Sequence, residues 1–229
     1  MDWSWEFVAE ITPDLLKGLV VTVKITLIAS VVALSIGLFF AIAKMSSVDL
    51  VRRSAVLVTE TIRRTPLLVQ LYFLFYVLPD IGIVLSPMVA GTIGLGLHYG
   101  TYVSEVYRAG IINVPAGQWE AARACNLTTR QTWTEIVLPQ AIPPMIPPLG
   151  NYVIAMFKET PILSAITVLD LMGEALAKAN FSYRYLEPIT LVAVGFLIVS
   201  LCSAALIRLL ENYLKLRAAP EQLKLRNQQ

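Results

Sequence analysis

Long runs of apolar residues alternate with short polar stretches along this chain of 229 residues. The first run, Leu19–Ala43, holds 25 residues and a single charge, Lys24. A helix needs about 20 apolar residues to cross the roughly 30 Å hydrocarbon core of a bilayer. The pattern therefore predicts an all-α integral membrane protein with five transmembrane helices, at about 18–43, 56–79, 86–108, 141–159 and 187–209.

The second of these spans is open to two interpretations. Its first half carries Glu60, Arg63 and Arg64, and charged side chains are costly in lipid. Either 56–79 is one crossing, or its charged half is a cytoplasmic interfacial helix and only 66–79 enters the bilayer.

Glycine and proline mark the third and fourth spans. Gly96 and Gly100 form a G-x-x-x-G pair, which allows a neighbouring helix to approach closely. Prolines at the start of the 141–159 span either free carbonyls that line a passage or make a rigid non-helical lead-in. The next apolar run, Pro161–Leu171, is too short to cross, and we expect a re-entrant, interfacial or buried short helix. The four prolines are Pro143, Pro144, Pro147 and Pro148.

Composition supports a membrane protein. Hydrophobic residues make up 56% of the chain and charged residues 15%, whereas soluble domains average about 25% charged. The mean hydropathy of +0.67 argues against both a soluble and a disordered chain. The net charge of +2 implies no nucleic-acid partner. One histidine and two distant cysteines exclude the common zinc motifs, so no metal is expected.

Lysine and arginine are unevenly divided between the predicted loops. Thirteen fall on one side of the membrane, in 44–64, 108–138 and 208–229, and four on the other. Because cytoplasmic loops carry the excess, we expect the N-terminus outside and the C-terminus in the cytoplasm. Met1–Asp14 has no basic residue, unlike a cleavable signal peptide. The predicted parts are a periplasmic segment at 1–17, a transmembrane permease domain at 18–212 and a cytoplasmic tail at 213–229.

The longest predicted loop, 113–140, has the pattern of two helices joined by a sharp turn. Pro115 suits a helix start, and the segment from Glu120 to Ala124 is strongly helix-forming. Asn126 follows, and asparagine tolerates the left-handed conformation that ends many helices. A short rigid helix presented to the cytoplasm is suited to a cleft on another protein.

The second half of this loop carries its own helix signals. Thr128 with Gln131 fits a capping box, in which each side chain bonds the backbone of the other residue. A second helix is expected from Thr128 to Leu138, ended by Pro139.

The spacing within the loop resembles the EAA loop of ABC importer permeases. That pattern is E-A-A, three residues, G, nine residues and I-x-L-P. Here Glu120-Ala121-Ala122 is followed at that spacing by Asn126 and by Ile136-x-Leu138-Pro139. Asn126 stands where the family has glycine, and we expect the turn to be kept. In that family the first helix of the loop is the coupling helix, which docks in a groove of the ATPase subunit.

Three further segments resemble one subfamily of these importers, the polar amino-acid uptake permeases related to the histidine and glutamine systems. They are 64–70, 102–111 and 157–164, with Arg64 where the subfamily has glycine in its GTPLLVQ segment. The similarity covers roughly residues 15–215. It extends to the permeases of ectoine and hydroxyectoine importers.

The resemblance implies a type I ABC importer permease of the bacterial inner membrane. Such a subunit moves a polar amino acid, or an amino-acid-derived compatible solute such as ectoine, by alternating access. The implied partners are a cytoplasmic ABC ATPase dimer, a second permease subunit (identical or paralogous), a periplasmic solute-binding protein and membrane lipid. This chain has no G-x-x-x-x-G-K-[ST] segment, so ATP would be bound by the separate ATPase. We therefore expect no cofactor of its own and no enzymatic activity.

The resemblance also assigns candidate coupling residues. Glu120 is the first candidate for a polar contact with the ATPase groove, although it could simply favour the dipole at a helix N-terminus. Ala121 and Ala122 would permit close seating, although helix propensity alone also explains them. The full set is Gly117, Glu120, Ala121, Ala122, Asn126, Ile136, Leu138 and Pro139.

Polar residues in or near the spans are candidates for the substrate pathway, because such residues usually face a cavity or a partner. Glu105 and Lys158 could contact the opposite charges of a zwitterion. Alternatively, Glu105 pairs with Arg108 at spacing i,i+3, and Lys158 and Glu159 extend to the membrane interface. The full set is Gln70, His98, Tyr102, Glu105, Lys158 and Glu159.

Two other classes of function are weaker. An intramembrane enzyme needs a nucleophile–base pair or paired carboxylates, and no such pair stands out in the sequence. A self-contained secondary transporter of small zwitterions often has internal inverted repeats, and none is apparent. The sequence therefore favours the importer permease and leaves its solute undecided.

Overall fold

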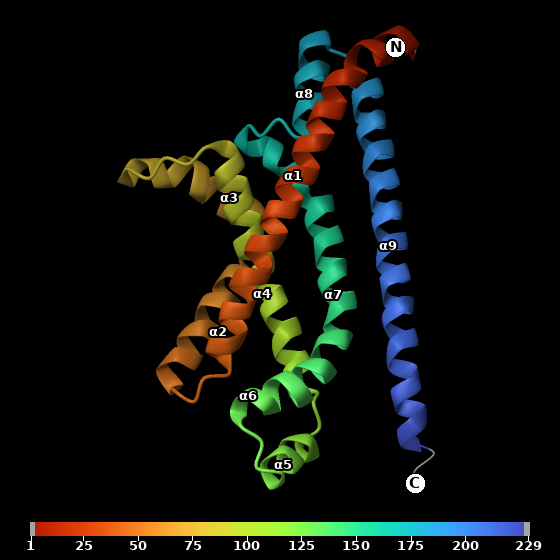
Figure 1. Ribbon diagram of the computed structural model, residues 1–229. Helices are drawn as coiled ribbons and strands as arrows, with labels where there is room; N and C mark the ends of the chain where they lie inside the picture. Colours follow the sequence, from red (N-terminus) through yellow and green to blue (C-terminus); the bar gives the residue numbers. More distant parts are fainter. Residues whose placement is uncertain (1–2, 227–229) are drawn as a thin grey trace.

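The computed structural model describes the backbone of residues 3–226 and the side chains of residues 3–209. Within this part of the chain every regular element is a helix, as predicted. Figure 1 shows two long helices, α1 (Trp5–Lys44) and α9 (Leu186–Arg226), with α7 (Leu138–Glu159) between them and α4 (Pro87–Ile112) crossing α1. The backbone of α9 continues past the predicted domain boundary at 212. The side chains of the predicted tail at 213–229 lie outside the described residues.

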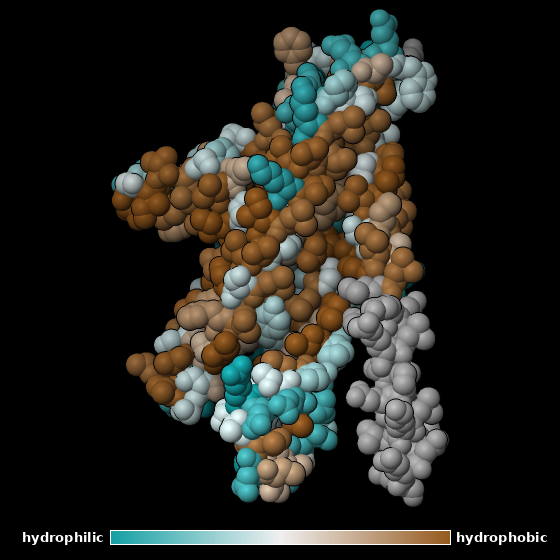
Figure 2. Space-filling view, viewed as in Figure 1, coloured by the Kyte–Doolittle hydropathy of each residue, from teal (hydrophilic) through white to brown (hydrophobic). Residues whose placement is uncertain are grey.

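The surface has the distribution expected of a membrane protein. Apolar side chains cover the middle of the face in Figure 2, and hydrophilic ones gather at its two ends. Among the described residues, α1 and the Leu186–Leu209 part of α9 are long and apolar enough to cross a bilayer. A third candidate is the bent pair Thr129–Ile166 and Leu171–Ser182. The all-helical class is thus confirmed, and five crossings remain a prediction.

α1 and α4 pack closely because small residues line their contact. Ala33 on α1 is fully buried. A methyl group added to Gly96 would lie 2.5 Å from Val32 Cγ1, and one added to Gly100 would lie 3.0 Å from Ile36 Cγ2. The G-x-x-x-G pair therefore receives side chains of α1, which is the tight packing that the sequence predicts.

The predicted span at 56–79 is wrong as a single helix. The first helix of this region ends at Arg64, and the next residue, Thr65, is extended with a ψ of 132°. A residue before proline is driven out of the helical conformation, and here Pro66 follows. The alternative division, a separate charged helix ahead of 66–79, matches the structure, while its position in the bilayer stays a prediction. The elements are α2 (Asp49–Arg64), α3 (Leu67–Tyr72), a π-helical turn η1 (Phe73–Val77) and a 3-10 turn η2 (Leu78–Ile81).

The second helix of the 113–140 loop does not end at Pro139, contrary to the prediction. α6 (Thr129–Gln131) continues through the π-helical turn η3 (Thr132–Val137) into α7. Pro139 directly follows the π-helical turn η3, where the regular hydrogen-bond pattern of the α-helix is already interrupted. The four later prolines lie inside α7, so a non-helical lead-in is wrong. Proline has no backbone N–H, so at each of these positions the carbonyl four residues earlier has no helical hydrogen-bond donor.

A buried short helix follows α7 near the N-terminal end of the molecule. In η4 (Thr160–Ile166), Leu163 and Ile166 are fully buried. The segment 161–171 therefore contains a short helix buried against the others, as one of the three interpretations has it, while its course relative to the bilayer stays a prediction. The next helix, α8 (Leu171–Ser182), is anchored to α1 because the Leu171 N–H donates to the hydroxyl of Thr22 at 3.0 Å.

An ion-pair cluster joins α8 to the start of α1. Asp14 accepts a hydrogen bond from Lys17 at 2.8 Å and pairs with Lys178 of α8 at 2.6 Å. Asp14 lies before the predicted span at 18–43. The hydrogen bond from Lys17, and then that from Lys178, lower the pKa of Asp14 to about 2.

Candidate functional site

The loop that carries the EAA pattern projects from the end of the molecule opposite the N-terminus (Figure 1). Its first helix is α5 (Ala116–Ala124), which begins directly after Pro115, as predicted. α6, η3 and α7 then lead back toward the middle of the molecule. The loop is therefore helix, turn, helix, as the sequence indicates, although its second helix continues into α7.

Asn126 makes the turn that the sequence assigns to it. Its φ of 54° is left-handed. Leu127 N–H donates to Ala122 O at 3.0 Å and Asn126 N–H donates to Arg123 O at 3.0 Å. These two bonds are the pair that defines a Schellman ending, in which a left-handed residue satisfies the last carbonyls of a helix. Asparagine thus replaces the family's glycine without loss of the turn.

The start of α6 is fixed by the predicted capping box. Thr128 N–H donates to Gln131 Oε1 at 3.0 Å, and Gln131 N–H donates to Thr128 Oγ1 at 3.3 Å. The chain direction after the turn is therefore set by local hydrogen bonds on both sides of it.

Internal packing holds α5 against the second half of the loop. The rings of Trp119 and Trp133 meet edge to face with centroids 5.4 Å apart. Gln140 on α7 donates to Gln118 on α5 at 3.3 Å. Beneath them lies a buried apolar cluster, so α5 is attached to α7 as one rigid unit. The buried members of this cluster are Val114, Val137, Ala141 and Met145.

The outward face of α5 contains three of the eight predicted coupling residues. Gly117, Glu120 and Ala121 are exposed, and a methyl group added to Gly117 would meet nothing within 4 Å. The chain's own packing therefore does not require glycine there. Glu120 is the fifth helical residue, outside the first turn, so the helix dipole gives it little reason to be acidic.

The remaining predicted coupling residues have other surroundings. Ala122 is only 3% exposed and serves the packing of the loop itself, so it is not available as a contact surface in the way that Ala121 is. Ile136 and Leu138 are half-buried, and Asn126 and Pro139 are exposed.

A cavity of about 370 Å³ lies between α4 and α7. On α7 it is lined by Pro144, Pro148 and Tyr152, which recur every four residues and so share one helix face. We refer to this space as the α4–α7 cavity. The other lining residues are Tyr102, Glu105, Val106, Ala109 and Gly110 on α4, Asn113 directly after it, and Met145 on α7.

Aromatic rings form a continuous cluster at the side of this cavity. The Tyr102 ring lies 5.7 Å from that of Tyr152 and 5.4 Å from that of His98, centroid to centroid. Tyr99 contacts His98 and Tyr152 at 5.6 and 6.1 Å. His98 is thus buried in an aromatic cluster beside the cavity. Among the described residues no group of three or more His, Cys, Asp or Glu is placed to hold a metal.

Gln70 braces the break between α2 and α3. Its amide nitrogen donates to Ile62 O at 2.7 Å and to Thr65 O at 2.9 Å, and lies 3.1 Å from His98 Nδ1. The GTPLLVQ-like segment therefore closes the exposed carbonyl end of α2. Gln70 Oε1 is buried and has no hydrogen-bond partner in the described structure.

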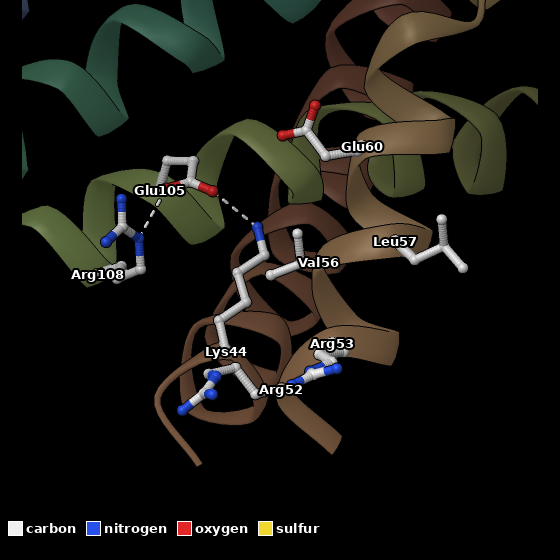
Figure 3. A pocket seen from close by; sticks show the side chains of 8 residues that line it. All are labelled: Lys44, Arg52, Arg53, Val56, Leu57, Glu60, Glu105 and Arg108. Atoms are coloured by element: carbon white, nitrogen blue, oxygen red, sulfur yellow. Dashed lines mark hydrogen bonds and ion pairs between the residues drawn. The ribbon is translucent and has the colours of Figure 1, made fainter. Parts of the chain in front are cut away.

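Glu105 is at the centre of an ion-pair cluster (Figure 3). It accepts from Lys44 at 2.8 Å and from Arg108 at 2.8 Å, and Arg63 lies 3.8 Å away. Arg63 also lies over the ring of Tyr102, 5.8 Å from its centroid. The predicted i,i+3 pairing with Arg108 is confirmed, and Lys44 adds a second strong pair that the sequence did not reveal.

Lys158 and Glu159 lie farther along α7 and are exposed. Tyr152 and Tyr102 lie side by side, and α7 and α4 run in opposite directions. Lys158 is six residues past Tyr152 and Glu105 is three residues past Tyr102, so the two charged residues are separated by roughly 13 Å along the helix axes. The structure therefore does not bring Glu105 and Lys158 together around one small solute. Glu159, in contrast, interacts electrostatically with both His98 and Tyr99.

Sequence reasoning missed Tyr99, Tyr152 and Lys44 as parts of these sites. A signal for Tyr152 was present, because Pro144, Pro148 and Tyr152 repeat at helical spacing. It was obscured by the expectation that the prolines interrupt the helix.

Comparison with known proteins gives a consistent result. The family described as "Binding-protein-dependent transport system inner membrane component" matches residues 5–215. The chain is 38% identical over 214 residues to "Probable amino-acid ABC transporter permease protein y4tG" of Sinorhizobium fredii, covering 93% of each. It is 37% identical over 172 residues to the L-cystine transport system permease protein TcyB of Bacillus subtilis, covering 75% of this chain and 74% of that one.

Solved structures include one of similar sequence. The crystal structure of an amino acid ABC transporter with histidines has a chain that matches with a TM-score of 0.87 and 36% identity. The match covers 93% of this chain and all of that one. A methionine ABC transporter in an inward-facing conformation matches with a TM-score of 0.63 at 14% identity, which shows the shared fold alone.

Proposed function

This chain belongs to the inner-membrane components of binding-protein-dependent transport systems and is an amino-acid ABC transporter permease subunit; from that premise we propose how it couples and what it carries. Its family is one of transport proteins and not of enzymes. We propose that it imports a polar amino acid by alternating access, driven by ATP hydrolysis on a separate ATPase dimer. A compatible solute derived from an amino acid, such as ectoine, is the second candidate cargo.

The rigid, outward-facing α5 is the observation that carries the coupling proposal. Glu120 and Ala121 are exposed on a helix whose other side is fixed to η3 through the Trp119–Trp133 contact and to α7 through the Gln140–Gln118 hydrogen bond. A helix held in this way transmits a push without bending. We propose that Gly117 and Ala121 let the ATPase surface approach closely and that Glu120 makes a polar contact with it.

The α4–α7 cavity supports the proposed path of the solute. Its volume of about 370 Å³ lies in the range of small-molecule sites. Pro144 and Pro148 leave the carbonyls of Gln140 and Pro144 without their helical donors, and such carbonyls are tolerated in a membrane where they line a cavity. The aromatic cluster and Glu159 could bind an ammonium group of the solute. The free carbonyls of Gln140 and Pro144 could accept hydrogen bonds from the solute farther toward the start of α7.

The complete transporter in this proposal has further partners. A periplasmic binding protein delivers the solute, and a second permease subunit, identical or paralogous, completes the pathway. The loop containing α5 faces the cytoplasm, with the N-terminus outside, because basic residues are concentrated at that end. The relatives' names include amino-acid and L-cystine transport, which favours an amino acid over ectoine.

Uptake into proteoliposomes tests the proposal. Vesicles containing this permease, its partner subunit and its ATPase should accumulate a labelled amino acid only when ATP and binding protein are supplied. Glu120→Arg should lower uptake at least tenfold and leave thermal stability unchanged. Glu135→Arg, an exposed acidic residue in the second half of the same loop, is the matched control and should retain uptake.

The opposite results are equally informative. Uptake that follows an ion gradient without ATP would identify a self-contained secondary transporter. Equal loss of uptake in Glu120→Arg and Glu135→Arg would remove α5 from the proposed role and leave only a general charge effect.

A further inference from the structure

A second pocket, of about 560 Å³, lies where the end of α1, the length of α2 and α4 meet (Figure 3). It is at the same end of the molecule as α5 (Figure 1). Neither the coupling loop nor the α4–α7 cavity uses most of its residues. We call it the basic pocket, and it is lined by Lys44, Arg52, Arg53, Val56, Leu57, Glu60, Glu105 and Arg108.

Positive charge exceeds negative charge in this pocket. Four basic side chains line it, against two carboxylates. The Glu60 carboxylate is paired with Arg63 and Arg64, which are not in the lining. Arg52 and Arg53 share a single carboxylate, that of Asp49. The pocket therefore presents uncompensated positive charge to an incoming anion.

The wall formed by α2 is apolar as well as basic. Only Ala55 and Thr59 of this helix are buried, so α2 rests on the protein along one narrow edge. Leu57 lines the pocket yet is 68% exposed, and Val56 beside it is 43% exposed. A basic helix with such apolar side chains is suited to the boundary between lipid headgroups and acyl chains. An inorganic anion would bind only the basic side chains, whereas a lipid would contact these with its headgroup and the apolar side chains with its acyl chains.

We propose that the basic pocket binds the phosphate headgroup of an anionic phospholipid from the membrane surface around α2. Basic pockets between helices at the cytoplasmic surface are a known physical means of holding such headgroups. The bound lipid would fill the space between α2 and α4 and hold α2 against Glu105 and its partners. The inference requires the membrane location of the chain but not solute import, so it stands or falls separately from the proposed transport.

Two matched substitutions on α2 test this site. Arg53→Gln and Arg64→Gln each remove one positive charge from an exposed side chain, 78% and 81% exposed, that pairs with a carboxylate four residues earlier. Only Arg53 lines the pocket. The full-length chain in neutral detergent would be titrated with phosphatidylglycerol, phosphatidylcholine or inorganic phosphate, and bound ligand counted by native mass spectrometry.

Phosphatidylglycerol should bind to wild type and to Arg64→Gln with the same affinity, and about fivefold more weakly to Arg53→Gln. Phosphatidylcholine and inorganic phosphate should not bind at comparable concentrations. Equal weakening in the two variants would overturn the proposal, because it would show attraction by the surface as a whole. Binding of inorganic phosphate with the same sensitivity to Arg53 would also overturn it, since the site would then recognise a free anion.

Discussion

α4 meets its two principal neighbours in opposite ways. Toward α1 it presents Gly96 and Gly100, and Val32 and Ile36 fill the space so closely that an added methyl group would collide with them. Toward α7 it presents Tyr102 and leaves the α4–α7 cavity. The contact with α1 has no free volume at Gly96 and Gly100. The contact with α7 is closed at Gly110, where an added methyl group would collide with Met145 Cε, and is open along the cavity. The comparison indicates that α1 and α4 form a fixed pair, to which α7 is held at Gly110 while free space remains beside it along the cavity.

The largest effect is expected where the closed contact is forced open. Gly96→Leu places side-chain atoms where Val32 already lies, because even Cβ would be 2.5 Å from Val32 Cγ1. Overpacking of this kind costs about 3 kcal/mol or more when backbones must separate. We expect the unfolding temperature in detergent to fall by several degrees and uptake to be lost.

Gly117→Ala is the control for this substitution, because nothing lies within 4 Å of its Cβ position. Its unfolding temperature should stay unchanged. If Gly96→Leu were as stable as Gly117→Ala, α1 and α4 could not be regarded as a fixed pair.

The open contact should respond in function more than in stability. Tyr152→Ala removes the ring that meets Tyr99 and Tyr102 across the cavity. An aromatic face contributes about 0.5–2 kcal/mol to the binding of an ammonium group, so uptake at low solute concentration should fall up to about tenfold through a higher KM. Phe181→Ala, 89% exposed on α8, provides the control. An unchanged KM in Tyr152→Ala would place the solute path elsewhere.

Replacing a proline of α7 is expected to have a smaller effect, in which stability rises and uptake falls. Pro148→Ala restores an N–H that can donate to the carbonyl of Pro144, and a proline inside a helix costs about 3 kcal/mol relative to alanine. The variant should therefore unfold at a higher temperature while uptake falls a few-fold. Pro87→Ala, at the first turn of α4, should change neither quantity. A gain in both stability and uptake would show that α7 does not need its free carbonyls.

The smallest effect belongs to the exposed ion pairs between α1 and α8. The pKa of Asp14 is lowered to about 2, so its pairing stabilises the fold above the ordinary pKa of 3.8 and is lost as the pH falls toward 2. Asp14→Asn should lower the unfolding temperature at pH 7 by an amount near the limit of detection, because exposed pairs contribute little. The difference from wild type should shrink between pH 4 and pH 2. A constant difference over that range would mean that charge is not its cause.

The sequence could predict those features that depend on local chemistry. Asn126 ends α5 because asparagine accepts a left-handed backbone, and Thr128 with Gln131 starts α6 through their own hydrogen bonds. In both cases the residues that determine the conformation are within a few positions of one another. The EAA spacing, over residues 120–139, identified the coupling loop in a different way, by resemblance to the ABC importer permeases.

Features that depend on distant residues could not be predicted in the same way. Lys44 pairs with Glu105 across 61 positions of the chain, and hydropathy gives no sign of it. The helical state of the proline-rich start of α7 also depends on packing, since Ala141 and Met145 are buried in the cluster beneath the loop. The local rule that proline ends a helix was therefore outweighed by burial.

Beyond Pro13, α1 contains no proline until it ends at Lys44, and its 31 residues there reach roughly 45 Å. One extremity of this rod is tied to α8 by Asp14, and the other is tied to α4 by Lys44. A straight helix fastened at both ends transmits a tilt at the α5 end of the molecule to the α8 end. In the proposed orientation this would link the ATPase side of the membrane with the side where the solute arrives, without a relay of intermediate side chains.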